Sequence, residues 1–191
     1  MIIEDGTGDG YIAGVNKDNR LEVIATAQSR VTDISEKSGE AFLIASDFIS
    51  LTDTGIFNAL VYIKNTSEKD VLIDKVRTCS SGSGSLQLRI IMNPTAGTIV
   101  DDANAADRLS SNSGSNKTFS DFGLAYAASA GGKTITDGDN LTQFINRSPG
   151  HSIQDYSGSL ILARGGSMAI TCKPSTANTV CVEVQLWMDE K

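Results

Sequence analysis

The sequence predicts an all-β protein, an antiparallel β-sandwich of jelly-roll-like type with an extended N-terminal arm. Three observations predict this fold. Apolar residues alternate with polar ones in several segments, most clearly where Val180, Val182 and Val184 alternate with Cys181 and Glu183. The connections between such segments are short and polar, and few stretches carry a helical repeat. At 191 residues, the chain has the length of one domain with an arm or insertion.

The same two-residue period places the other strands. In chain order we expect strands at residues 11–15, 21–27, 41–46, 56–64, 71–78, 86–92, 160–163, 168–172 and 179–188. Clusters of Asn, Asp, Gly, Ser and Pro separate them, at residues 16–19, 52–55, 65–70, 164–166 and 174–178.

Three regions break the strand pattern. Residues 93–116 are rich in Ser, Asn, Asp, Ala and Gly, which predicts a loop insertion. Residues 121–130 and 139–145 are each expected to hold a short helix, the second with Asp139 as N-cap and with Leu141, Phe144 and Ile145 on one face. The domain organisation expected is an N-terminal arm and hairpin over residues 1–30, then a β-sandwich over 31–191 with a long insertion near 93–118.

The net charge, the length of the apolar runs and the first residues argue against several classes of protein. Lys and Arg number 16 against 23 Asp and Glu, so a net charge of -7 argues against nucleic acid as a partner. No stretch approaches 18 apolar residues, and Glu4 and Asp5 stand where a secretory signal needs basic residues. No membrane partner is expected, and we expect synthesis and folding in a cytoplasm.

Histidine and cysteine usage narrows the chemistry. His151 is the only histidine, which excludes sites with several His ligands and leaves a single conventional general base. Cys79, Cys172 and Cys181 lack a C-x-x-C spacing and are expected to be free thiols. Cys172 belongs to an apolar row and Cys181 to the opposite row of the last strand, so a bridge between them is not expected.

Three motifs have a functional and a structural interpretation. Residues 131–134, Gly-Gly-Lys-Thr, match the end of a phosphate-binding loop, but Ala127 replaces the required first glycine, so a turn is expected. Residues 5–10 and 137–140 have the oxygen-rich composition of cation loops without a complete ligand pattern, and tight turns explain both. His151 is expected in a surface loop. No catalytic residue, metal or cofactor is expected.

Three segments carry a resemblance to a known class of proteins. Residues 3–15 with 19–23, residues 92–98, and residues 165–170 with 173–179 resemble virion structural proteins of tailed bacteriophages. The resemblance implies an assembly protein of the capsid decoration or cement type, located in the virion, without catalysis. It implies two partners: the major capsid protein and further copies of the chain, with a homotrimer expected.

The physical properties of the chain agree with an assembly role. The Gly-rich N-terminus and first hairpin suit an arm that adds strands to a neighbour, with Tyr11, Ile12, Val15, Leu21 and Val23 as the expected partner contacts. The alternative function is a receptor- or glycan-binding β-sandwich of a head or tail fibre. The low aromatic content, 6% with Trp187 as the sole tryptophan, disfavours that alternative. An enzyme would require an essential His151.

Overall fold

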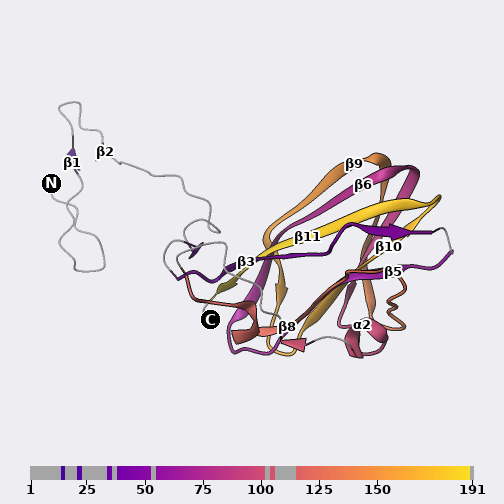
Figure 1. Ribbon diagram of the computed structural model, residues 1–191. Coiled ribbons are helices and arrows are strands. Elements are labelled where there is room, and N and C mark those ends of the chain that lie inside the picture. Colours follow the sequence, from indigo (N-terminus) through magenta and orange to yellow (C-terminus); the bar gives the residue numbers. More distant parts are fainter. Residues whose placement is uncertain are drawn as a thin grey trace.

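The structure, a computed structural model, describes residues 14–15, 21–22, 34–35, 38–52, 55–101, 104–105 and 115–189 (Figure 1). The prediction of an all-β, antiparallel, sandwich-like fold is confirmed, because every strand pair is antiparallel and one nine-stranded sheet makes up most of the described chain. Its strands are β3 (Ala41–Ala45), β4 (Ile49–Leu51), β5 (Asn58–Asn65), β6 (Asp70–Met92), β7 (Asn104–Ala105), β8 (Gly123–Ala127), β9 (Asp139–Leu162), β10 (Ser167–Pro174) and β11 (Asn178–Asp189).

Two very long strands, β6 and β9, organise the fold. They pair along most of their lengths, and they run side by side in Figure 1 through one shared bend. On its other edge, β6 pairs with β11 over residues 70–80 and with β10 over residues 86–92. The sheet therefore divides at the bend into two layers. One holds β11, β3 and β4 beside the first half of β6, and the other holds β10, β5, β8 and β7 beside the second half.

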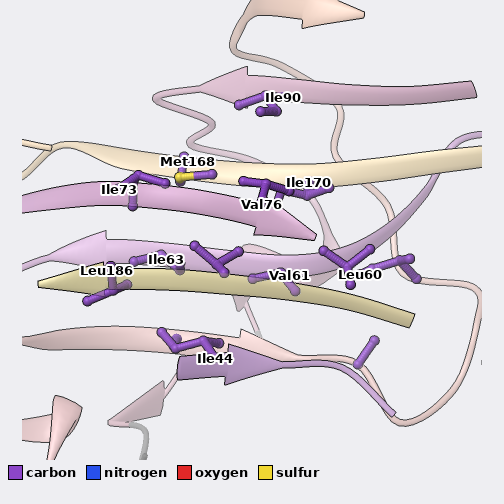
Figure 2. Close-up of a cluster of buried hydrophobic side chains, with 14 of the residues drawn as sticks. Ile44, Leu60, Val61, Ile63, Ile73, Val76, Ile90, Met168, Ile170 and Leu186 are labelled. Atoms are coloured by element: carbon purple, nitrogen blue, oxygen red, sulfur yellow. The ribbon is translucent and has the colours of Figure 1, made fainter. Parts of the chain in front are cut away.

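The core lies between these two layers. Apolar side chains from the inner faces of the strands are buried there, and Figure 2 shows such side chains from β3, β5, β6, β10 and β11. The set labelled in Figure 2 comprises Ile44, Leu60, Val61, Ile63, Ile73, Val76, Ile90, Met168, Ile170 and Leu186. Each such side chain contributes about 1.5–3 kcal/mol on burial, so the alternating apolar rows hold the layers together.

Opposite the bend, the two layers approach each other again at β3 and β8. The N–H of Asp47, just after β3, donates to the carbonyl of Ala128, just after β8, at 2.9 Å. Phe42 of β3 packs against Phe119 and Phe122, with ring centroids 5.7 Å apart in both pairs. Phe119 lies in a short 3-10 helix, η1 (Phe119–Asp121), that precedes β8. The sandwich is therefore nearly closed on this side.

The insertion after β6 lies against the outer face of the second layer. A single-turn helix, α2 (Thr98–Asp101), buries Ile99 against Ala59 and Tyr62 of β5. Asp137, in the connection between β8 and β9, accepts hydrogen bonds from the N–H groups of Thr95 and Ala96, both at 2.9 Å. These contacts tie the start of the insertion to the connection between β8 and β9.

Three local predictions were wrong. Residues 123–127, expected within a helix, form β8, because they pair with β5 from Val61 to Asn65. Residues 139–145, expected as a helix capped by Asp139, form the start of β9. The surface loop expected around His151 is the middle of β9, where His151 lies opposite Cys79 of β6.

Near the N-terminus the described residues form one small ladder. Strand β1 (Gly14–Val15) pairs antiparallel with β2 (Leu21–Glu22), in the register Gly14 to Glu22 and Val15 to Leu21. The rest of the expected arm lies outside the described residues, and the jelly-roll topology stays a prediction. No helix within the described ranges is long and apolar enough to cross a membrane.

Candidate binding edge

Strand β9 is the feature of the fold best suited to binding. One of its edges pairs with β6, and among the residues that the structure describes no strand pairs with the other edge. Its side chains alternate between an inner row and an exposed outer row. An open edge of 24 residues offers main-chain hydrogen-bonding groups to another chain.

The exposed row of β9 carries large apolar side chains. Leu141, Ile145, Ile153 and Ile161 are 50, 62, 53 and 50% exposed. Natural proteins usually place charges or prolines on open edges to prevent association, so isoleucines at these positions favour a surface that is covered by a partner.

Two features interrupt the edge and divide it into windows. At the bend, Pro149 lies between the pairs Ser148–Gly84 and Gly150–Ser80, and it has no N–H to donate. Near the C-terminal end, the pairing passes from Asp155–Lys75 to Leu160–Ile73, so residues 156–159 form a bulge. Two stretches of β9 keep regular pairing with β6: residues 142–148, the first window, and residues 150–155, the second window.

Local hydrogen bonds fix the bulge. The Asp155 carboxylate accepts from the N–H and the hydroxyl of Ser157, at 3.0 and 2.8 Å. Ser157 and Gly158 have positive φ angles of 48° and 76°, and a Cβ on Gly158 would come within 2.6 Å of the Trp187 ring. The residues of this segment therefore favour the bulge. Trp187 packs beneath it, is 2% exposed and is not accessible to a ligand.

The outer row of the second window carries an imidazole, an apolar side chain and a carboxylate in turn. His151, Ile153 and Asp155 lie on the outer row, opposite Cys79, Arg77 and Lys75 of β6. The hydrogen bond from the Ser157 hydroxyl, together with the Ser157 N–H and nearby Lys75, holds the pKa of Asp155 below its ordinary value. Asp155 is therefore a carboxylate at neutral pH.

A groove opens beside this edge between the two halves of β9. It has a volume of about 380 Å³ and is lined by Leu141, Thr142, Gln154, Tyr156, Ser159 and Leu160. Polar side chains lie on the inner row here because the sandwich is open at β9. The Asn146 amide, for example, donates to the hydroxyls of Thr78 and Ser152, at 2.7 and 2.6 Å.

The remaining candidate sites have structural roles. In the Gly-Gly-Lys-Thr segment, the Gly132 N–H donates to Asn58 Oδ1 at 2.9 Å and the Thr134 N–H donates to Thr98 Oγ1 at 3.0 Å. These bonds fasten the connection between β8 and β9 to β5 and to α2, so both amides are used within the fold. No group of three potential metal-ligating side chains occurs within the described ranges.

The structure describes only two of the five predicted partner contacts. Val15 pairs with Leu21 in the backbone ladder of β1 and β2, whereas Tyr11, Ile12 and Val23 lie outside the described residues. Sequence reasoning missed the β9 edge, although the outer isoleucines recur every eight residues at 145, 153 and 161.

The cysteines lie as their rows predict. Cys172 is fully buried in the core, and burial raises the pKa of its thiol to about 12. Cys181 belongs to the opposite row of β11, where its thiol donates to the Ser46 carbonyl at 3.4 Å. Its cross-strand neighbour is Cys79, not Cys172.

Comparison with protein-family models, curated proteins and solved structures finds no match to this chain. Function is therefore inferred from its own residues and geometry.

Proposed function

We propose that the chain is a structural protein of a bacteriophage virion that decorates or cements the capsid by binding neighbouring capsid subunits, without catalysis. The open edge of β9 with its exposed isoleucines carries the proposal, because it suits a protein that works by association. The three segments that resemble tailed-phage virion proteins supply the context. Repeated attachment to a capsid lattice turns modest contacts into strong retention.

The surroundings of the only histidine favour a role without catalysis. The neighbouring hydroxyl, on Ser152, points to the inner row and takes part in hydrogen bonds with Thr78 and Asn146, at 2.9 and 2.6 Å. It serves the packing of the bend. Replacing His151 with Ala is expected to leave the stability of the fold unchanged, because its side chain is exposed.

The test is the composition of purified virions. Virions of the phage that encodes the chain are purified by density gradient, and their proteins are quantified by mass spectrometry. The proposal predicts the chain in a fixed ratio to the major capsid protein, and predicts that antibody labelling marks the head. Absence from virions contradicts the proposal.

The groove beside β9 favours a second candidate, a receptor- or glycan-binding module. Tyr156 offers a half-buried aromatic ring beside Thr142, Gln154 and Ser159, a combination that suits a sugar. A glycan array with the full chain tests it. Binding that is lost in the Tyr156→Ala variant, together with antibody labelling of fibres, would favour this function over the capsid role.

A further inference from the structure

The second window of β9 is bounded in a way that fits pairing with a copy of itself. It begins after Pro149 and ends at the bulge that starts at Tyr156. Ile153 lies midway between Pro149 and Ser157. If two copies of the window align antiparallel with Ile153 opposite Ile153, each proline lies opposite the bulge of the other copy. Both interruptions then fall at the ends of one ladder, in which the last pair joins Gly150 to Tyr156, the first residue of the bulge.

Symmetry restricts how two identical edges can pair. A two-fold axis perpendicular to the sheet keeps outer side chains on the outer face, so it passes through a pair of identical residues. With the axis at Ile153, His151 of each copy lies opposite Asp155 of the other. On the inner row, Ser152 lies opposite Gln154. The two apolar side chains meet at the axis, and an imidazole faces a carboxylate on both sides.

We propose that two copies of this protein associate through residues 150–156 of β9, paired antiparallel around a two-fold axis at Ile153, with His151 of each copy against Asp155 of the other. The carboxylate accepts a hydrogen bond from the imidazole N–H. The contact covers the exposed part of Ile153, which is 53% exposed in the single chain. This association goes beyond the proposed function and does not depend on the capsid role.

The first window lacks this complementarity. Centred on Ile145, it would place Gln143 opposite Arg147, with no opposite charges. Centred on Gln143, it would run into an irregularity between Thr142 and Asn140, which pair with Ile90 and Ile91. Beyond the bulge, only residues 160–162 pair regularly with β6, too few for a ladder.

A two-fold contact gives a dimer, whereas the trimer expected from the sequence requires another surface. An edge contact of seven residues per copy is small, so we expect a dissociation constant in the micromolar range. The first measurement is sedimentation equilibrium of the full chain over a range of concentrations. A mass that rises toward two chains supports the inference. A monomer at every concentration, or a trimer, overturns the inference. Neither result would contradict the proposed function, which is tested by the presence of the chain in virions.

Matched variants locate the contact. Ile153→Lys places two like charges at the axis and is expected to weaken the dimer by about tenfold or more. Ile145→Lys and Ile161→Lys make the same change on the same exposed row and are expected to leave the dissociation constant within about twofold. A dimer lost in Ile145→Lys but kept in Ile153→Lys overturns the inference.

A charge exchange tests the register. His151→Glu alone places a carboxylate opposite the carboxylate of Asp155, and Asp155→Lys alone removes the acceptor of the imidazole N–H. Each is expected to weaken the dimer by about tenfold. The double variant places a carboxylate opposite an ammonium group and is expected to recover most of the affinity. Circular dichroism verifies that each variant is folded. Effects of the two changes that simply add, with no recovery, contradict the proposed register.

Discussion

Asn65 is the polar side chain on which the end of the sandwich most depends. It lies at the end of β5, fully buried, and its amide nitrogen donates to the carbonyls of Lys69 and Leu162 at 2.7 and 2.8 Å. Its oxygen accepts from the N–H and the hydroxyl of Ser67, both at 2.9 Å. One side chain thus joins the β5–β6 turn to the end of β9.

Replacing Asn65 with Ala removes all four hydrogen bonds. Each contributes about 1 kcal/mol net, and a buried carbonyl left without a partner costs about 1–3 kcal/mol. The Leu162 carbonyl bond is buried, whereas the groups of the turn are partly exposed and regain water. We therefore expect a loss of about 3 kcal/mol in the free energy of unfolding, which lowers Tm by roughly 6–12 °C in a chain of this size.

Urea unfolding followed by the fluorescence of Trp187, the sole tryptophan and a buried one, measures this loss. Asn65→Asp tests the cause, because a carboxylate of the same shape faces two carbonyl oxygens and is expected to cost at least as much. The exposed Asn116→Ala is the control and is expected to change stability by less than about 0.5 kcal/mol. A loss below about 1 kcal/mol for Asn65→Ala would refute the assigned role.

Three further predictions follow from other contacts. Thiol reagents should modify exposed Cys79 in the native protein and Cys172 only after unfolding, because the latter is buried with a pKa of about 12; native labelling of Cys172, detected by peptide mass, contradicts this. The hydrogen bonds of Asp137, the one from the Thr95 hydroxyl foremost, hold its pKa below the ordinary 3.8, so the unfolded state takes up the proton first. The stability that wild type holds over Asp137→Asn should therefore be full above pH 3.8 and shrink below it in urea titrations at several pH values; a constant difference contradicts the assignment. Gly158→Ala should lower stability by about 1 kcal/mol or more, since a Cβ there meets the Trp187 ring, and an unchanged urea midpoint contradicts the packing.

The sequence predicts the strands in which an apolar row faces the core and a more polar row faces outward. Val180, Val182 and Val184 lie in the core and Glu183 on the surface, so their alternation predicts both the strand and its inner face. In β10, Met168, Ile170 and Cys172 also lie in the core, although Ala169 and Thr171 between them are buried as well. These strands are enough to predict the fold class. Most of them lie in the closed part of the sandwich, where one face of each strand packs on the core.

Strand β9 escapes such reasoning because its pattern is inverted. Ile145 and Ile153 point outward, while Asn146 and Ser152 point inward, where the open side of the sandwich accommodates polar groups. The spacing of Leu141, Phe144 and Ile145 also imitates one face of a helix, and only pairing with β6 decides for a strand. The candidate binding edge was hidden from the sequence for this reason.

The most direct test of an assembly role for the β9 edge is amide hydrogen exchange of the full chain at low and high concentration, about 5 µM and about 300 µM, which bracket the affinity of a small interface. Exchange within residues 150–156 reports on the proposed contact, and exchange within 142–148 is the internal control. We predict that protection rises with concentration in residues 150–156 alone. Unchanged exchange in that window, or protection confined to residues 142–148, would contradict the account.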